Sequence, residues 1–460
     1  MAGRTLATPP PSLTANQTLT FLLGLALLLG TAVVLGRLAE RIGMPAIVGE
    51  LLTGVILGPS LLGALAPGLT SRILPATATQ MHLLDAVGQV GVLLLVAITG
   101  THLDLAMLHR RRAAAITVSL SGLLIPLALG VAAGTVVPAS LIAGTTERWV
   151  FALFLGVAMC VSAIPVIAKT LTDMRLLHRD IGQLTLAAGT VDDAVGWLLL
   201  SIVSAAATVG VGAGAISRSA AYLVAFLALA ATAGRVLVRF VLTRAARSPQ
   251  AGPTLAAVVV LVLVGAATTQ ALGMEATLGA FVVGILLGLP GTIDQAKLAP
   301  MRTVVLSILA PIFMATAGLR MDLTALRRAD VAVAAAAILM LAVAGKFAGA
   351  YVGARLCRLN QWEALALGAG MNARGVVEVI IASVGLRLGV LSVATYTIVV
   401  AVAVVTSLMA PPVLRWAMRR IAENDQELLR NAQLASTGQA AGGREQGSDA
   451  PWPDRKKPPS

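Results

Sequence analysis

Residues 155–168 read LGVAMCVSAIPVIA, and residues 367–380 read LGAGMNARGVVEVI. Each stretch lies in an apolar run of the length that a membrane-spanning helix needs. Each run is interrupted near its middle, the first by Pro165 and the second by polar residues. The second lies seven apolar runs after the first, and because that number is odd, the two copies enter the membrane from opposite sides. Inverted copies with matching interruptions are typical of membrane folds whose site lies near the middle of the bilayer.

A second pair of matching stretches has nearly the same offset. ITGTHLDLAMLHRR (98–111) and TAGLRMDLTALRRA (316–329) share Gly, Asp, Leu, Leu and Arg at equal spacing. The first closes the third apolar run and the second closes the tenth. Two matched pairs at nearly the same offset favour an internal inverted repeat over a chance match.

The composition is that of a membrane protein. Of the 460 residues, 57% are hydrophobic and only 12% are charged, about half of the charged share that a water-soluble surface needs. We predict an all-α polytopic protein with about 13 transmembrane helices. The predicted spans are 17–36, 46–66, 82–101, 113–137, 148–170, 181–208, 219–242, 252–272, 275–290, 300–319, 331–356, 363–386 and 391–416.

The connections between these spans predict the orientation. One side of the membrane holds more than twice as many Lys and Arg residues as the other, which places it in the cytoplasm. We therefore expect an extracytoplasmic N-terminal segment (1–16), a transmembrane domain (17–418) and a disordered cytoplasmic tail (419–460) in a multi-pass protein of the cytoplasmic membrane. The net charge of +13 follows from this topology, and no aromatic residues alternate with the basic ones as nucleic-acid binding would require.

Two aspartates stand where a membrane span should be apolar. Asp192 and Asp193, in AAGTVDDAVGW (187–197), lie near the middle of the sixth span. A charge at this depth calls for a partner or a function, and two adjacent carboxylates cannot both ionise cheaply in a low dielectric. Because neighbouring residues on a helix point about 100° apart, the two can face different partners. Such a carboxylate can hold either a proton or a cation.

Lys346 is the matching cation, fifteen residues into the eleventh span. Gly345, Gly349 and Gly353 beside it form a doubled GxxxG stripe, which permits close contact with another helix. The sequence leaves open whether Lys346 pairs with an aspartate or extends to the cytoplasmic interface.

The two interrupted spans contribute further polar residues. Pro165 removes a backbone donor, which is expected to free carbonyls near Ser162 and Ala163. In the matching stretch, Arg374 and Glu378 are spaced i,i+4, so they either pair with each other or act in transport. The residues expected to support the site are Ser162, Pro165, Asn372, Arg374 and Glu378.

With these motifs, residues 18–416 resemble the bacterial monovalent cation:proton antiporters of the second cation/proton antiporter branch. The resemblance rests on GMPAIVGELLTGVILGPSLLG, SAIPVIAKTL, GTVDDAVGW, EATLGAFVVGILLG, PIFMATAGLRMDL, the GK pair at 345–346 and MNARGVVEVIIASVGL. It implies a core domain with two crossing unwound helices (spans five and twelve) and a dimerisation domain (spans one to three and eight to ten). It also implies an ion-binding acid at Asp193 paired with Asp192, a core lysine at Lys346, a homodimer and, because two acids are present, electrogenic exchange. His102 and Glu275 depart from the family pattern, which often has Glu and His there.

From the residues and the resemblance we expect a secondary transporter that exchanges Na⁺, or Li⁺ or K⁺, for protons, with Asp193 as the ligand of the transported cation. Alternatives are an exporter of a small organic solute or drug on the same fold, and a membrane sensor or channel without coupled exchange. We expect no enzymatic activity, no cofactor, no nucleic-acid partner and no resident metal. The two cysteines, Cys160 and Cys357, form no metal-binding motif.

Overall fold

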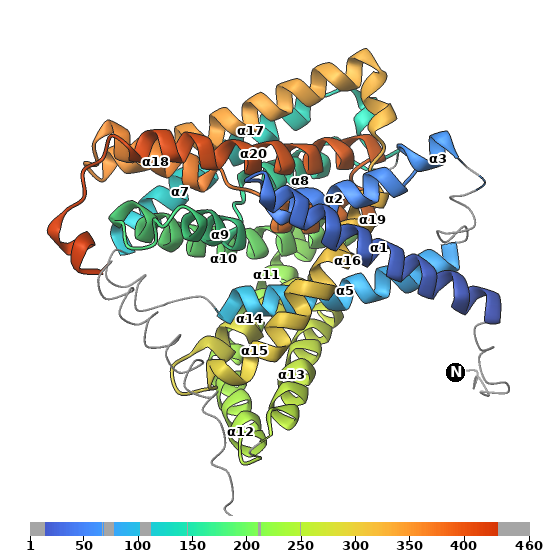
Figure 1. Ribbon diagram of the computed structural model, residues 1–460, viewed down its shortest axis with the longest axis horizontal. Helices are drawn as coiled ribbons and strands as arrows, with labels where there is room; N and C mark the ends of the chain where they lie inside the picture. Colours follow the sequence, from blue (N-terminus) through green and yellow to red (C-terminus); the bar gives the residue numbers. More distant parts are fainter. Residues whose placement is uncertain are drawn as a thin grey trace, which may run out of the picture.

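The computed structural model describes residues 14–66, 68, 78–101, 112–144, 146–209, 213–248 and 250–430. These residues form helices and connecting loops, with one isolated β-bridge between Ile142 and Leu391. Figure 1 shows most of the long helices running along the long axis of the molecule. The start of α1 lies at one end of this axis and the segment after α20 at the other. We call these ends the N-terminal face and the C-terminal face.

The helices form two groups, and within each group the helices pack mainly against one another. The first group, which contains both interrupted spans, consists of α7 (Arg112–Val136), α8 (Arg148–Cys160), α9 (Ile164–Asp173), α10 (Asp180–Val209), α17 (Ala329–Leu356), α18 (Gln361–Met371), α19 (Val376–Arg387) and α20 (Val393–Met418). The second consists of α1 (Ala15–Arg41), α2 (Ala46–Leu57), α3 (Leu62–Leu65), α5 (Ala78–Thr101), α13 (Ala251–Ala271), α14 (Ala276–Gly288), α15 (Gln295–Val304) and α16 (Ala310–Leu319). Between them in sequence lie α11 (Ala213–Leu229) and α12 (Arg235–Ala245).

The helices follow the predicted spans in order, with one shorter than expected. In the described residues, 11 helices are long and apolar enough to cross a membrane, or 12 if the bent pair α18–α19 is one span. The predicted ninth span (275–290) contains α14, a helix of 13 residues. At about 1.5 Å per residue it extends only ~20 Å, which is less than the ~30 Å of a bilayer core.

A row of glycines lets α17 approach α7 closely, as the sequence predicts. A Cβ atom added at Gly349 would lie 2.5 Å from the backbone oxygen of Ser121 on α7, and one added at Gly353 would lie 2.7 Å from the Cα of Val118. Only glycine permits such contact between the two backbones. The approach places α7 carbonyl groups next to Lys346, one residue from the first glycine of the row.

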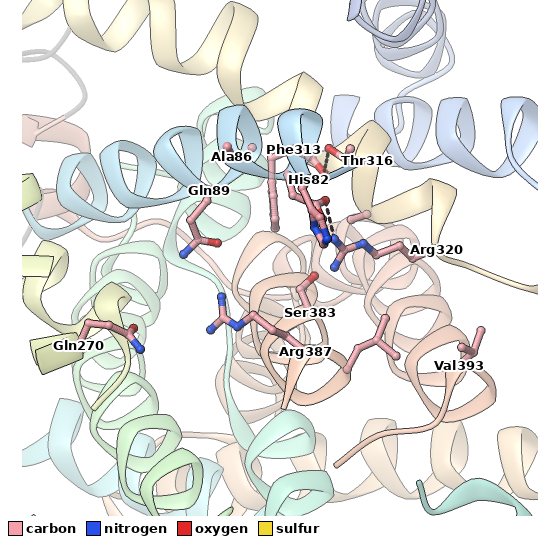
Figure 2. Close-up of a pocket in the computed structure, with 14 residues that line it drawn as sticks. His82, Ala86, Gln89, Gln270, Phe313, Thr316, Arg320, Ser383, Arg387 and Val393 are labelled. Carbon is pink, nitrogen blue, oxygen red and sulfur yellow. Dashed lines mark hydrogen bonds and ion pairs between the residues drawn. The ribbon is translucent and has the colours of Figure 1, made fainter. Parts of the chain in front are cut away.

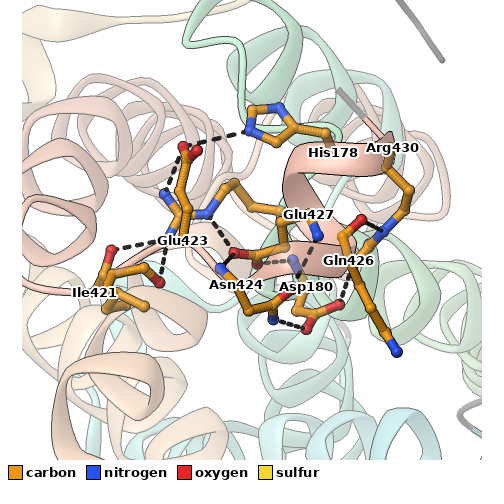
Figure 3. A network of polar contacts seen from close by, with 10 residues as sticks. His178, Asp180, Ile421, Glu423, Asn424, Gln426, Glu427 and Arg430 are labelled. Carbon is orange, nitrogen blue, oxygen red and sulfur yellow. Dashed lines mark hydrogen bonds and ion pairs between the residues drawn. The ribbon is translucent and has the colours of Figure 1, made fainter. Parts of the chain in front are cut away.

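The first residues of the predicted disordered tail (419–460) are ordered, and this part of the prediction is wrong. Residues 425–430 form a helical turn that packs against the start of α10, and Glu427 is buried there. Arg179 donates from Nε to Glu427 Oε2 at 3.1 Å, and Arg430 Nη2 lies 2.5 Å from Asp180 Oδ1 (Figure 3). These pairs hold the chain to Arg430 in place. The rest of the predicted tail, residues 1–13 of the predicted N-terminal segment (1–16) and His102 lie outside the described residues.

Candidate functional site

Two broken helices cross in the middle of the first group. α8 ends at Cys160 and α9 begins at Ile164, while α18 ends at Met371 and α19 begins at Val376. The backbone N–H of Ala163, in the first break, donates to the oxygen of Ala373, in the second, at 3.3 Å. The matching interruptions seen in the sequence are therefore real breaks that meet in space.

Each break has a local cause. Pro165 has no N–H to donate to Val161 and would clash with the preceding turn, so it cannot continue α8, but it fits the first turn of α9. In the second break, a Cβ atom added at Gly375 would lie 2.7 Å from Val166 Cγ2 on α9. The glycine thus allows the two broken segments to cross at close range.

Asp192 is completely buried and is fully bonded to the protein. Its Oδ2 lies 2.6 Å from Nζ of Lys346 and 2.8 Å from Oγ of Ser162, and its Oδ1 accepts from Oγ of Ser119 at 2.5 Å. These donors come from α17, the first break and α7. One countercharge and two hydroxyl donors are the partners that an ionised carboxylate needs when it is buried.

Lys346 is equally buried, and it uses all three of its N–H groups. Besides Asp192, its Nζ donates to the backbone oxygens of Cys160 at 2.5 Å and Gly122 at 3.1 Å. Cys160 is the last residue of α8, where helix carbonyls have no partner within the helix, so the cation caps that end. The side chain of Lys346 thus pairs with Asp192 and does not extend to the cytoplasmic interface of the membrane.

Ser162 connects the pair to the second broken helix. Its Oγ lies 2.8 Å from Asp192 Oδ2 and 2.8 Å from the backbone oxygen of Met371, the last residue of α18. A hydroxyl has one proton, so it can donate to only one of these acceptors at a time. Ser162 can therefore alternate between the carboxylate and the helix end.

Asp193 contrasts with its neighbour. It is also completely buried, but neither carboxylate oxygen has a hydrogen-bond partner among the described residues. The backbone N–H of Ile164, the first residue of α9, lies near this carboxylate. The first break packs closely against the same helix, since a Cβ atom added at Gly196 would lie 2.8 Å from Val161. Among the described residues, no Lys or Arg forms an ion pair with Asp193, in contrast to Asp192.

Arg374 and Glu378 are both buried and lie in contact, with Nε and Oε1 3.5 Å apart. Arg374 belongs to the break and not to a helical face, so the contact spans the N-terminus of α19. Glu378 Oε2 accepts the N–H of Gly375 at 2.7 Å, and Arg374 Nη2 donates to the oxygen of Ala342 at 3.1 Å. The structure shows the pairing, which is one of the two alternatives that the spacing left open, and these contacts stabilise the start of α19. Asn372, in the same break, is buried and neither atom of its amide has a described partner.

A cavity of about 850 Å³ opens near the N-terminal face, lined by polar residues of both helix groups. Figure 2 shows Gln89, Gln270 and Arg387 extending toward one another from α5, α13 and α19. Beside the cavity, Arg387 Nη2 lies 2.8 Å from Glu275 Oε2, which joins the first group to the residue before α14. This pair is not predicted from the sequence. Glu275 is 4% exposed and reaches an arginine 112 residues away.

Comparisons with known proteins agree with this geometry. The family model described as sodium/hydrogen exchanger, transmembrane, matches residues 25–420. The Na(+)/H(+) antiporter NhaS4 of Synechocystis is 31% identical over 405 residues, which cover 87% of this chain and 98% of the relative. Cation/H(+) antiporter 20 of Arabidopsis thaliana is 30% identical over 82% of this chain, but the match spans only 46% of that longer protein.

Among solved structures, the sodium proton antiporter MjNhaP1 from Methanocaldococcus jannaschii has the same fold. The TM-score is 0.65 at 15% identity, and the match covers 88% of this chain and 100% of the other. The relatives and this structure are all cation or sodium antiporters by name. They give no support to the alternative of an organic-solute exporter.

Proposed function

This chain belongs to the sodium/hydrogen exchanger transmembrane family, and from that membership we propose that it is an antiporter that exchanges sodium ions for protons, with Asp193 as the carboxylate that binds either ion. Its relatives support cation/proton antiport in general. The choice of sodium, with lithium or potassium as further substrates, and the roles of individual residues are our proposal.

The observation that carries the proposal is the difference between two adjacent buried acids. Asp192 has Lys346 as a countercharge, whereas the oxygens of Asp193 have no described partner. A carboxylate buried in this way is costly when it is ionised alone, so it favours the state in which a proton or a cation is bound. Competition of both ions for one group couples their movements, because the site cannot carry both at once.

The surrounding backbone supports binding of a bare cation. Two breaks meet beside α10, and broken helices expose carbonyl groups and helix ends that can replace water around an ion. Asn372 and Ser162 add side-chain oxygens in the two breaks. Which of them coordinates the ion together with Asp193 is part of the proposal.

Lys346 can supply a second proton. If the bound cation also draws on Asp192, the ion pair with Lys346 breaks, and a buried lysine without a countercharge favours its neutral form. Ser162 can then turn its hydroxyl to the oxygen of Met371. Two protons would leave for each cation, and the exchange would move net charge across the membrane.

Transport would proceed by alternating access, in which the first helix group moves relative to the second. The family fold and the separate packing of the two groups support this motion. We further propose a homodimer in the cytoplasmic membrane, with the N-terminal face outside and the C-terminal face in the cytoplasm, as the distribution of Lys and Arg favours. A reporter fused after Arg430 that is active only in the periplasm would contradict this orientation.

The proposed activity is tested with the purified protein in liposomes that contain a pH-sensitive dye and carry a preset proton gradient. Addition of Na⁺, Li⁺ or K⁺ in turn should dissipate the gradient, with the strongest response to Na⁺. Choline chloride at equal ionic strength serves as the control. A gradient that is unaffected by all three cations would contradict antiport, and a response to K⁺ alone would contradict the choice of sodium.

A further inference from the structure

One face of α10 carries a row of four polar side chains, namely Asp193, Trp197, Ser201 and Ser204. The steps of four, four and three residues keep them within an arc of about 80° on the helix. Their exposed fractions are 0%, 1%, 1% and 3%. α10 starts at the C-terminal face, where Asp180 meets Arg430, so the row leads from Asp193 toward the N-terminal face.

None of these four side chains has a hydrogen-bond partner for its polar atoms among the described residues. Hydroxyl groups elsewhere on the same helix behave differently. Thr185, Thr190 and Thr208 each donate to the backbone oxygen four residues earlier, the usual solution for a hydroxyl in a helix. A buried polar group without a hydrogen-bond partner costs free energy. A whole row of such groups therefore indicates that water or an ion binds beside it.

The neighbouring helix continues the row. The rings of Trp197 and Phe281 on α14 are 6.2 Å apart between centroids. α10 and α14 cross the bundle in opposite directions, so one turn closer to the N-terminal face lie Ser201 on α10 and Thr277 on α14. The hydroxyl of Thr277 is also buried, at 2% exposure, and also has no described partner.

The row points toward the cavity at the N-terminal face. Two residues before Thr277 is Glu275, which pairs with Arg387, and Arg387 lines that cavity (Figure 2). The polar atoms therefore follow one another from the cavity, past the Glu275–Arg387 pair, along the contact between the two helix groups, to the unpartnered carboxylate of Asp193.

We propose that Trp197, Ser201, Ser204 and Thr277 line the path by which water and the transported cation reach Asp193 from the N-terminal face. The hydroxyl oxygens stand in for part of the cation's hydration shell, and the indole N–H binds water. The part of this inference that concerns the cation rests on the proposed antiport, whereas access of water to the row does not. The Glu275–Arg387 pair lies where the path meets the cavity.

The path is tested by cysteine labelling of the full-length protein in liposomes. Ser201→Cys and Ser204→Cys are treated with a small membrane-impermeant thiol reagent added at the N-terminal face. The control is Val203→Cys, which is buried to a similar degree, at 5% exposure, but lies about 120° around the helix from the middle of the row. The parent protein gives the background from Cys160 and Cys357. We expect both serine positions to react at least tenfold faster than Val203→Cys. Reaction at the control rate would overturn the path.

Exchange is measured in the same liposomes, which separates this inference from the proposed function. Fast labelling without any cation-driven proton movement would support a water path and contradict antiport. Exchange with slow labelling would support antiport and overturn the path. The double variant Ser201→Ala with Ser204→Ala provides a second measurement. It should raise several-fold the cation concentration for half-maximal exchange when the cation is added at the N-terminal face, and an unchanged concentration would count against the path.

Discussion

Nζ of Lys346 lies 2.6 Å from Oδ2 of Asp192, and neither side chain is exposed to solvent. The ammonium group also donates to two backbone oxygens, and the carboxylate accepts from two serines. Each charge in this pair is therefore fully bonded. In contrast, Asp193 is one residue away and its carboxylate has no described hydrogen bond. Within the part of the chain that the structure describes, one acid of the pair thus has a cationic partner and the other has none.

The first prediction concerns this ion pair. Lys346→Gln should lower the free energy of unfolding by about 3–5 kcal/mol, because it leaves Asp192 as a buried charge without a countercharge. The double change Asp192→Asn with Lys346→Gln removes both charges and should recover most of that loss. Thermal unfolding of the purified variants in detergent measures both effects. Equal stability of the single and double variants would show that the charges do not interact.

The same double variant tests the second transported proton. Without an ionisable lysine, exchange should carry less charge per cation and depend more weakly on an imposed membrane potential. The measurement compares rates in liposomes with and without a potassium-valinomycin potential. Full potential dependence in the double variant would show that Lys346 carries no transported proton and serves only the structure.

The third prediction concerns the contact of α17 with α7. Gly349→Ala should destabilise the protein by about 1–3 kcal/mol, because the new Cβ would lie 2.5 Å from the oxygen of Ser121 and force the helices apart. The matched control is Gly30→Ala in α1, where the new Cβ meets nothing within 4 Å. Alanine is the better helix former there, so the control should be neutral or slightly more stable. Similar losses in both variants would contradict the close contact.

The sequence was sufficient for much of this architecture because the physical constraints are strong. A bilayer requires long apolar helices, so the order of the spans could be predicted. A charge in such a span needs a partner, so Lys346 could be named from the sequence as a candidate partner of the two aspartates. Pro165 cannot continue α8, which predicts the first break, and the matching repeat predicts the second break at the corresponding place.

Other features depend on contacts that the sequence does not reveal. The helical turn at 425–430 has the polar composition of a tail, and its contacts with Arg179 and Asp180 make it ordered. Glu275 and Arg387 meet because the two helix groups pack together, and no local pattern links residues so far apart. The unpartnered row on α10 resembles ordinary helical serines until their hydrogen bonds are known. α14 is short because the backbone is extended at Glu275, just before the helix, and again at Leu289, just after it.

The fourth prediction addresses the segment after α20. Arg179→Met should lower the free energy of unfolding by about 1–3 kcal/mol, because Glu427 would lose its charged donor while buried (Figure 3). Lys169→Met is the control, since Lys169 pairs with Glu40 and Asp173 at half-exposed positions, and such pairs contribute at most about 1 kcal/mol. Thermal unfolding and limited proteolysis near Arg430 report the effect. An Arg179 variant as stable as the control would contradict the docking.

The most direct test of the account is Asp193→Asn. The amide keeps the shape of the side chain, but it neither binds a proton reversibly nor offers net charge to a cation. Exchange is measured in liposomes as sodium-driven proton movement, with Asp330→Asn, a change of an acid paired only near the surface with Arg328 and Ser140, as the control. We expect Asp193→Asn to insert and fold normally and to show no sodium-driven proton movement, while the control retains the parent rate. Near-normal exchange by Asp193→Asn would contradict the assignment of Asp193 as the shared site.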